Sequence, residues 1–448
     1  MDQHTSLRVG LLGCGNVGGA LVRLLVDDGD RIVARTGFRL EVAAVAVRSV
    51  ARQRDVPVPP GVLTTDAHAV VSDPRVDVVV EVMGGIEPAR ALILAALKAG
   101  KPVVTANKEL LANCGAELFE AASTAGVDLL FESSVAGGIP LIRPLRESLA
   151  GERIGRIMGI VNGTTNFILT RMTESAATYH DALAEAQSLG YAERDPTADV
   201  EGFDAASKAA ILANVAFGAR VVAGDVYREG ISAVTPADIA VARRMGYVIK
   251  LLVVIEHEGD PGPDGPAGAE GGGRESIAVR VHPAMLPGTH PLASVRDSFN
   301  AVFVEGDAVG ELMFLGRGAG GMPSASAVLG DLLDAAHNLT TGGAGRSVAL
   351  RHIPLKPIDE LSTAYYLALQ VTDRPGVLHA VTGVLGRHQV SVRSMEQEGL
   401  AGGEGAGARL VFVTHPALER DVQACLHDLR ALDSVERIGG LMRVVGMP

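Results

Sequence analysis

The sequence has little that would tie it to an oxidising compartment, a membrane or a nucleic acid. Its three cysteines (Cys14, Cys114 and Cys425) are far apart and odd in number, so they predict neither a disulfide framework nor a metal site. A reducing cytoplasm is the location that we expect. No apolar run reaches the roughly 18 residues needed to span a bilayer. The polar N-terminus runs directly into a strand, so we expect no signal peptide.

Basic clusters are also absent from the chain. The net charge is −12, and no run of Lys or Arg interrupts the sequence. Nucleic acids and anionic membranes both require a clustered basic surface, so we expect no nucleic-acid or membrane partner. Lysine is scarce, which makes each lysine more informative than usual.

What is present indicates several domains, because 448 residues with 47% hydrophobic content favour about three cores. Residues 1–140 alternate strand-like and helix-like patterns, which predicts an α/β domain with a doubly wound parallel sheet. Residues 141–338 mix helices with strands and indicate an α+β domain, in which we expect a helix over Pro236–Ile249. A loose surface loop is expected over Glu258–Gly273.

The C-terminal part predicts a separate small domain. A linker is expected over residues 339–360. Residues 361–448 then give the order βαββαβ, which is typical of a ferredoxin-like sandwich, with Gly399–Gly407 as a hairpin loop inside it.

A glycine turn near the N-terminus predicts a dinucleotide site. The segment Gly13-Cys14-Gly15-Asn16-Val17-Gly18 fits GxGxxG and stands between an apolar strand and a helix. Gly13 permits the tight turn, Gly15 lets the backbone approach a pyrophosphate, and Gly18 lets the helix pack closely. The start of the helix, with Asn16 and Val17, supplies free N–H groups for the phosphates.

The end of the second strand predicts which nucleotide binds. An acidic residue there would bind the ribose 2′-hydroxyl of NAD, but this chain has Arg48. An arginine suits a 2′-phosphate, so we expect NADP(H) to be used well; NAD(H) stays open, as does the alternative of a plain surface arginine.

Two lysines are candidates for proton transfer. Lys108 follows Thr105 just beyond a predicted parallel strand, where ligands bind in such sheets. Lys208 is four residues after Asp204, so a helix would place both on one face. Apolar neighbours indicate a partly buried helix, and a desolvated lysine exchanges protons near neutrality. A solvated surface ion pair is the alternative.

The motifs of this chain, taken together and in their order along the sequence, resemble those of homoserine dehydrogenases over nearly the whole chain. The resemblance rests on the glycine turn, residues 105–108, the segments 131–140 and 159–166, the carboxylate-rich stretch 190–208, and residues 316–328. It implies NAD(P)H-dependent reduction of L-aspartate 4-semialdehyde to L-homoserine, and the reverse, in threonine and methionine biosynthesis. Arg194 departs from the family pattern, where we expect proline.

The resemblance also assigns roles to residues. Lys208 looks like the general acid/base, with Lys108 as a second lysine near nicotinamide and substrate. Glu193 resembles the homoserine-binding residue, with Asp199 and Asp204 in support. A second set resembles a monovalent-cation site, with sodium expected, and consists of Glu132 and the carbonyls of Val135, Gly137 and Ile139. Gly318 and Gly320 resemble a second glycine turn at the nucleotide, so we expect residues 318–340 to complete the first domain.

The C-terminal unit resembles an ACT domain, a regulatory module that binds amino acids. The segment from Asp373 through Gly376, Val377 and Leu378 joins a strand to a helix, where backbone N–H groups can hold a small zwitterion. The resemblance implies feedback inhibition, with L-threonine as the effector, and a homodimer or homotetramer. A domain that only assembles subunits is the alternative.

Other functions are less well supported by the residues. A sensor that kept the nucleotide fold without catalysis would not need Lys108, Glu193, Asp204 and Lys208 together. A related dehydrogenase with another substrate stays open. An acylating semialdehyde dehydrogenase is disfavoured, because Cys114 lies in no motif that would supply a partner histidine.

Overall fold

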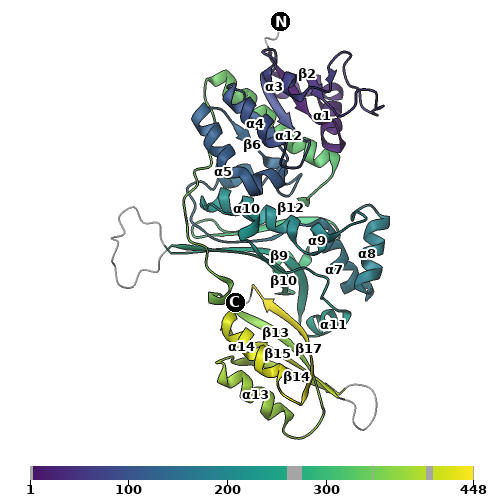
Figure 1. Ribbon diagram of the computed structural model, residues 1–448, viewed down its shortest axis with the longest axis vertical. Coiled ribbons are helices and arrows are strands. Elements are labelled where there is room, and N and C mark those ends of the chain that lie inside the picture. Colours follow the sequence, from purple (N-terminus) through teal and green to yellow (C-terminus); the bar gives the residue numbers. More distant parts are fainter. Residues whose placement is uncertain (1–3, 260–274, 346, 400–406, 447–448) are drawn as a thin grey trace, which may run out of the picture. The chain divides into compact units, whose positions relative to one another are not determined.

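A computed structural model describes residues 4–259, 275–345, 347–399 and 407–446 (Figure 1). Most of the two loops expected over Glu258–Gly273 and Gly399–Gly407 therefore lies outside the described residues. The chain divides into two compact units. The first comprises residues 1–156, 204–226 and 299–353, and the second comprises residues 157–203, 227–298 and 354–448.

The first unit contains a parallel sheet with the strand order β3-β2-β1-β4-β5-β6. Its strands are β1 (Thr5–Leu12), β2 (Phe38–Ala46), β3 (Leu63–Thr64), β4 (Val78–Glu81), β5 (Val103–Thr105) and β6 (Leu129–Leu130). The chain starts in the middle and builds outward in both directions, which confirms the doubly wound α/β sheet. The carboxyl ends of β1, β4 and β5 lie side by side at one edge.

Helices follow the strands of this sheet. They are α1 (Asn16–Asp27), α2 (Gly29–Thr36), α3 (Ala67–Ser72), α4 (Ala89–Lys98), α5 (Lys108–Ala125), α6 (Ile142–Arg146), the 3₁₀ helices η1 (Glu132–Ser134) and η2 (Ala223–Asp225), and the late helices α10 (Phe203–Phe217) and α12 (Gly321–Thr341). Helix α5 is capped by Asn107, whose side chain accepts the Leu110 N–H at 3.1 Å. A hairpin of β11 (Phe299–Gly306) and β12 (Gly310–Arg317) completes the unit.

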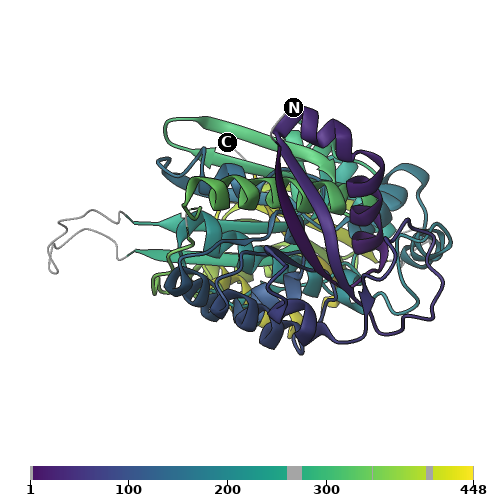
Figure 2. The same cartoon turned by 90° about the horizontal axis from the view of Figure 1, so that it is seen from above.

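Helix α12 packs into the core of the first sheet although it comes late in the chain. Its Ala325, Val328 and Leu332 join one buried cluster with Val9 and Leu11 of β1. Figure 2 shows α12, in green, beside the purple strands and helices of the N-terminus, and α12 contacts α1 directly. Burying such aliphatic side chains contributes about 1.5–3 kcal/mol each.

The second unit is organised around one mixed sheet, with the consecutive strands β7-β9-β10-β17-β13-β15-β14. Its first half holds β7 (Ile154–Ile160), β8 (Tyr227–Arg228), β9 (Tyr247–Glu258), β10 (Ser276–Pro287), α7 (Gly163–Ser175), α8 (Tyr179–Ser188), α9 (Thr197–Val200), α11 (Pro236–Arg244) and η3 (Pro291–Ser294). The expected helix over Pro236–Ile249 was wrong at its end. Helix α11 stops at Arg244, and Tyr247 already pairs with Pro287 in an antiparallel ladder.

The C-terminal part confirms the predicted βαββαβ order. It consists of η4 (Ile358–Glu360), β13 (Ser362–Val371), α13 (Val377–Arg387), β14 (Val392–Gly399), β15 (Ala408–Thr414), the short β16 (Ala417–Leu418), α14 (Glu419–Arg430) and β17 (Val435–Val444). Helices α13 and α14 pack on one face of its sheet, around Leu367, Leu369 and Phe412. Strand β17 also pairs in parallel with β10, with Ala284 opposite Arg443. The strands of the C-terminal part therefore continue the sheet that contains β9 and β10.

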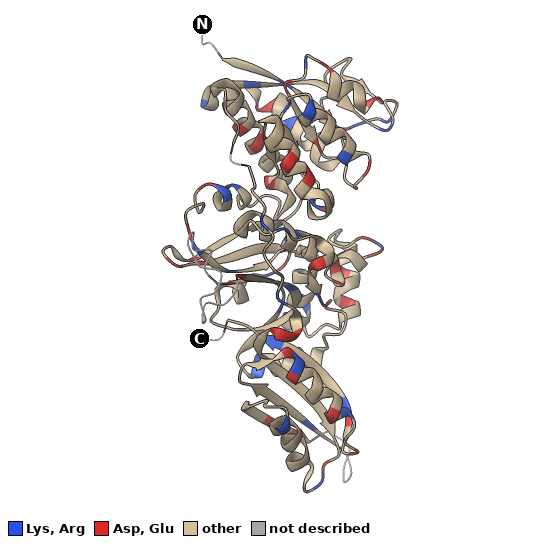
Figure 3. Ribbon diagram, turned by 60° about the vertical axis from the view of Figure 1, so that its left-hand side comes forward, with Lys and Arg blue, Asp and Glu red and all other residues tan. Residues whose placement is uncertain are grey.

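The described residues carry mixed charge and no membrane helix. Figure 3 shows basic and acidic residues interspersed along the helices. Within the described ranges, no helix combines the length and the apolar character that crossing a bilayer requires.

Candidate active site

The glycine turn after β1 has the geometry that a dinucleotide requires. Gly13 has φ +101°, and a Cβ there would lie 2.9 Å from the carbonyl oxygen of Val82. Around Gly15, by contrast, no atom lies within 4 Å of where a Cβ would stand, so its backbone faces open space at the start of α1. No side chain caps the helix there, which leaves its first N–H groups for a ligand. The residues therefore fit the pyrophosphate of a nicotinamide dinucleotide.

A second glycine turn reaches the same helix start. Gly320 has φ +130° and precedes α12, and a Cβ on Gly321 would lie 3.0 Å from the carbonyl oxygen of Asn16. Gly318 has no room for a side chain, because a Cβ would lie 1.9 Å from the amide of Asn300. Residues 318–321 thus lie beside the first turn.

Two arginines, Arg48 and Arg54, lie in the loop that follows β2. Arg48 is exposed and lies two residues beyond the end of β2. Arg54, which sequence reasoning missed, donates to the carbonyl oxygens of Arg52 and Ser49, both at 2.7 Å. It also lies near Cys14, whose thiol pKa is raised by burial and lowered in part by Arg54. Arg54 therefore folds the 49–54 loop back toward the glycine turn.

The segment after β5 is fixed by a buried carboxylate that the sequence motifs did not reveal. Glu81, at the end of β4, accepts the Thr105 hydroxyl at 2.7 Å and the Met83 N–H at 2.7 Å. Glu81 and Thr105 are both fully buried. The Thr105 hydroxyl in turn accepts the Asn107 N–H at 3.0 Å. This chain of bonds sets the start of α5, so that Lys108 is its first residue.

Lys108, Asp204 and Lys208 form one charged cluster. Asp204 and Lys208 lie one turn apart on α10, with the Lys208 Nζ 2.7 Å from Asp204 Oδ2. The Lys108 Nζ lies 2.5 Å from Asp204 Oδ1. The Asp204 and Lys208 side chains are only 6% and 10% exposed, whereas that of Lys108 is 47% exposed. The predicted pair is therefore buried rather than a solvated surface bridge, and it includes the second candidate lysine.

Electrostatics keep the Asp204 carboxylate ionised. Burial alone would raise the pKa of this carboxyl, but Lys208 and then Lys108 outweigh the burial and hold the pKa well below its usual range. A carboxylate that stays charged between two ammonium groups fixes both of them in place. Such a buried, paired lysine is suited to stabilise an alkoxide and to transfer a proton.

Glu193 and Asp199 belong to the second unit; Glu193 precedes α9, and Asp199 lies within it. Asp199 accepts the Asn162 side-chain N–H at 2.7 Å, and Asn162 caps α7. The Thr164 hydroxyl donates to the Tyr191 carbonyl at 2.8 Å. Glu193 is exposed, and its backbone carbonyl accepts Gln187 Nε2 at 3.0 Å. The N-cap residue and the first turn of α7 thus hold the segment 191–199 at its two ends, Tyr191 and Asp199.

At the expected cation site around Glu132, the carboxylate is already bonded to backbone N–H groups. Glu132 accepts the N–H groups of Leu141, Ile142 and Arg143 at 2.5, 2.8 and 2.8 Å, so its side chain caps α6. The other candidate ligands are the carbonyls of the buried residues Val135, Gly137 and Ile139. No backbone N–H in the turns and loops of the described residues donates to these three carbonyl oxygens.

Behind this turn, Asp331 of α12 accepts the Glu132 N–H at 2.8 Å and Arg143 Nη2 at 3.1 Å. Burial, and then the charge of Glu132, raise the pKa of Asp331 to about 7.

The ACT-like domain has an open pocket of about 430 Å³ at the start of α13. Asp373, Gly376, Val377 and Leu378 line it, together with Thr372 and Gln397 among others. Gly376 has φ +93° and precedes α13; the Val377 N–H donates to the Arg374 carbonyl at 3.4 Å, and no side chain caps the N–H groups that follow it. The buried Thr372 hydroxyl has no hydrogen-bond partner among the described residues.

Comparisons with known proteins agree along the whole chain. Family models match as "Homoserine dehydrogenase, NAD binding domain" over residues 13–132, "Homoserine dehydrogenase" over residues 140–333 and "ACT domain" over residues 365–432. Homoserine dehydrogenase of Corynebacterium glutamicum is 49% identical, with 98% of this chain and 96% of that protein covered.

Solved structures agree as well. A homoserine dehydrogenase from Thiobacillus denitrificans has a TM-score of 0.88 and 40% identity, with 98% of both chains covered. A mutant homoserine dehydrogenase from a hyperthermophilic archaeon, in complex with NADPH, has a TM-score of 0.58 and 28% identity over 74% of this chain and 98% of that chain. The chain belongs to the homoserine dehydrogenase family, NAD(P)-dependent oxidoreductases that act on a CH–OH group.

Proposed function

We propose that the chain reduces L-aspartate 4-semialdehyde to L-homoserine with NADPH, and catalyses the reverse, in threonine and methionine biosynthesis. The observation that carries this proposal is the buried cluster in which Asp204 contacts both Lys208 and Lys108. A bound nicotinamide supplies or accepts the hydride. The identity of the substrate is inferred from the family and not from this geometry.

In this mechanism Lys208 binds the aldehyde oxygen and gives it a proton as negative charge develops there. Its ammonium is nearly buried, so the charge interaction is weakly screened by water. Asp204 positions Lys208 and Lys108, while the half-exposed Lys108 supports the bound substrate and nicotinamide. Glu193 and Asp199 bind the ammonium of the amino-acid substrate, with Asp204 in support.

NADP(H) is the expected nucleotide, and NAD(H) is expected to bind less tightly. The fit of the two glycine turns supports a dinucleotide, and Arg48 supports a 2′-phosphate, with Arg54 ordering the loop next to it. The archaeal relative whose structure holds NADPH is consistent with this assignment. The other residues of the proposed nucleotide site come from the two glycine turns and the start of α5. They are Gly13, Gly15, Asn16, Val17, Gly18, Thr105, Lys108, Gly318 and Gly320.

A sodium ion is proposed at the turn that follows η1. Hard cations prefer oxygen ligands, and the carbonyls of the buried residues Val135, Gly137 and Ile139 accept no backbone N–H from the turns and loops of the described residues. The Glu132 carboxylate is already bonded to three amides, so its share in the site is its negative charge close to the cation.

The ACT domain is proposed to bind L-threonine and to inhibit the enzyme. Its pocket offers open helix N–H groups for a carboxylate, Asp373 for an ammonium, and the unbonded Thr372 hydroxyl for a polar side chain. A cytoplasmic homodimer or homotetramer is the expected assembly.

The test is an assay of NADPH oxidation by the purified protein with aspartate semialdehyde, with and without threonine. The Asp373→Ala variant should weaken threonine inhibition, and Asp421→Asn, on α14 of the same domain, should not. Oxidation that threonine does not affect would keep the enzyme and reduce the ACT domain to an assembly role. Absence of oxidation, with nucleotide still bound, would refute the proposed reaction.

A further inference from the structure

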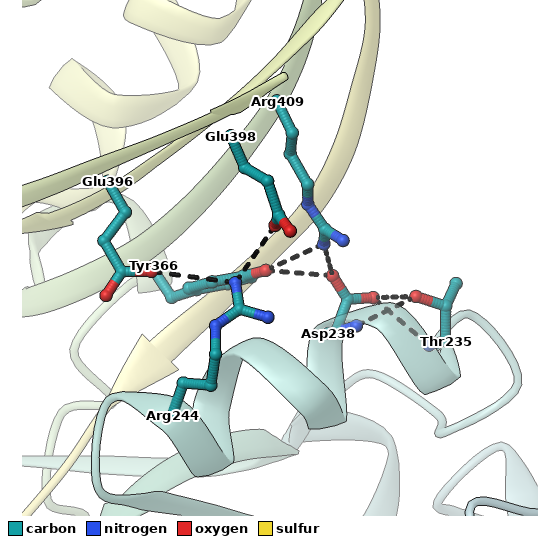
Figure 4. Close-up of polar contacts among 7 residues, drawn as sticks. All are labelled: Thr235, Asp238, Arg244, Tyr366, Glu396, Glu398 and Arg409. Atoms are coloured by element: carbon teal, nitrogen blue, oxygen red, sulfur yellow. Dashed lines mark hydrogen bonds and ion pairs between the residues drawn. The ribbon is translucent and has the colours of Figure 1, made fainter. Parts of the chain in front are cut away.

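One carboxylate joins helix α11 to the sheet of the ACT domain. Asp238, in the first turn of α11, is only 2% exposed. Its Oδ2 accepts the hydroxyl of Thr235 at 2.6 Å and so fixes the start of the helix. Its Oδ1 accepts the Tyr366 hydroxyl and Arg409 Nη2, both at 3.1 Å (Figure 4). Arg409 also donates to the Tyr366 hydroxyl at 3.2 Å. The three residues Asp238, Tyr366 and Arg409 are called the α11 junction below.

The junction and the proposed effector pocket are built on the same strands. Tyr366 lies on β13, which ends at the pocket residue Val371. Arg409 on β15 is followed directly by Leu410, which lines the pocket and pairs with Gln397 of β14. Successive residues of a strand point to opposite faces. A ligand that displaces the backbone at Leu410 on one face would therefore also displace Arg409 on the other.

The contact across the junction is tight. A Cβ on Gly440 of β17 would lie 2.7 Å from Asp238 Oδ1, so the carboxylate rests on a part of the sheet that has no side chain. The Arg409 side chain is 17% exposed and that of Asp238 is 3% exposed. Removing one partner of such a pair leaves a buried charge unpaired, which is strongly unfavourable. The helix therefore has to follow the sheet rather than slide over it.

From α11 the contacts continue to the substrate segment. Helix α11 packs against α7 and β9. The first residues of α7 hold the carboxylate-rich segment through the bonds from Asn162 to Asp199 and from Thr164 to the Tyr191 carbonyl. Glu193, the proposed homoserine-binding residue, lies between Tyr191 and Asp199. Every link from Arg409 to this segment lies within the second unit.

We infer that the α11 junction couples the ACT domain to the substrate segment 191–199, so that Asp238, Tyr366 and Arg409 act as positioning residues that carry effector inhibition. The effector half of this inference rests on the proposed function, whereas the mechanical coupling does not. Coupling of this kind requires that the effector favour one arrangement of the sheet, and hence of α11, over another.

The same helix and sheet provide a matched control. Arg244, at the end of α11, lies 3.3 Å from Glu398 and 3.7 Å from Glu396 of β14 (Figure 4). The side chain of Arg244 is 49% exposed, that of Glu396 is 45% exposed and that of Glu398 is 63% exposed. Exposed pairs contribute little and can rearrange in water. Loss of this pair should leave the coupling intact.

The experiment compares the full-length wild-type protein with Tyr366→Phe, Arg409→Met, Arg409→Lys and Arg244→Ala. Threonine binding is measured by calorimetry, and inhibition is measured in the NADPH oxidation assay with the KM for aspartate semialdehyde resolved from kcat. Tyr366→Phe removes one hydroxyl only, so it tests the junction even where Arg409→Met fails to fold.

In Tyr366→Phe and Arg409→Met we expect threonine to bind within roughly threefold of its wild-type Kd, while saturating threonine leaves most of the activity uninhibited. The change without threonine should be in KM rather than in kcat, since the segment binds substrate. Arg409→Lys should restore part of the inhibition, and Arg244→Ala should behave as wild type. Inhibition that still follows binding in both junction variants would overturn the inference, as would an equal effect of Arg244→Ala.

Hydrogen exchange separates failure of the inference from failure of the proposed effector. If threonine neither binds nor inhibits the wild type, the effector proposal fails, and the coupling is judged on the free enzymes. Tyr366→Phe and Arg409→Met should then speed amide exchange in residues 162–175 and 190–200, and Arg244→Ala should not. Unchanged exchange in those segments would refute the coupling.

Discussion

The Asp204 carboxylate lies 2.7 Å from the Lys208 ammonium, and its other oxygen lies 2.5 Å from Lys108. Both distances belong to strong charge-assisted contacts, and both lysines therefore depend on one acid for their placement. Lys208 is nearly buried, whereas Lys108 is half exposed. This asymmetry supports the proposal that Lys208 transfers the proton and that Lys108 has a supporting role.

The first prediction concerns Lys208→Ala. Loss of a positioned general acid should lower kcat by about 10²–10⁴-fold. NADPH binding, measured by the change in nucleotide fluorescence, should stay near the wild-type value, because the glycine turns are untouched. Lys98→Ala, at the exposed end of α4, is the control and should change neither quantity. Loss of nucleotide binding in Lys208→Ala would reassign this lysine to the cofactor site.

The second prediction concerns Asp204→Asn. Without the carboxylate, two ammonium groups face each other and neither is held at a fixed position. We expect kcat/KM for aspartate semialdehyde to fall by roughly 10²-fold, and Asp204→Glu to retain more activity than Asp204→Asn. Steady-state kinetics of the two variants measure this difference. Near wild-type activity in Asp204→Asn, which keeps the size of the side chain but not its charge, would indicate that the charge of Asp204 is not required.

The third prediction concerns nucleotide choice. Arg48→Ala should raise the Kd of NADPH by about tenfold, since a charge-assisted bond to a phosphate is lost, and leave the Kd of NADH within about twofold. Titrations with both nucleotides measure the ratio, and Arg35→Ala on α2 is the control. An unchanged ratio would make Arg48 a plain surface residue and shift attention to Arg54.

Parts of this picture were predictable from short-range patterns, and parts were not. The parallel sheet, the glycine turn and the i,i+4 pair of Asp204 and Lys208 follow from local spacing, and the structure contains them. The start of α5 could also have been read from the sequence, because Asn107 is a favourable cap in front of Lys108.

Long-range contacts are what the sequence could not reveal. Glu81 and Thr105 meet only because β4 and β5 pair, and Asp238 meets Arg409 across 171 residues. The wrong end of α11 has a local cause, because the residues after Tyr247 are apolar up to Ile255, apart from Lys250, and suit a buried strand as well as a helix.

The fourth prediction concerns sodium. Replacing NaCl by N-methylglucamine chloride at equal ionic strength should lower activity, because the proposed site at the carbonyls of Val135, Gly137 and Ile139 would lose its cation. Activity should return when NaCl is added and saturate at a fixed concentration, whereas an ionic-strength effect would not saturate. Equal activity in both salts would remove the cation from the proposed site.

The last prediction uses a lysine outside the mechanism. Lys250 of β9 is 3% exposed, and its ammonium donates to the Val295 carbonyl at 2.5 Å and to Asn166 Oδ1 at 2.9 Å. Burial lowers its pKa to about 8, with Glu174 and Asp297 opposing the shift and Arg296 adding to it. Between that value and the pKa of about 10.4 expected for an unfolded lysine, the unfolded chain binds more protons than the folded one. Stability from this residue must therefore rise with pH through that window.

Lys250→Met should lack this rise. The free energy of unfolding of the wild type, relative to Lys250→Met, should increase by up to about 3 kcal/mol between pH 7 and pH 10. Urea unfolding of both proteins at several pH values measures the difference, and Lys98→Met, which removes an exposed lysine, should show no such trend. A difference that is constant with pH would mean that Lys250 keeps an ordinary pKa, and that the bonds to Val295 and Asn166 compensate fully for its burial.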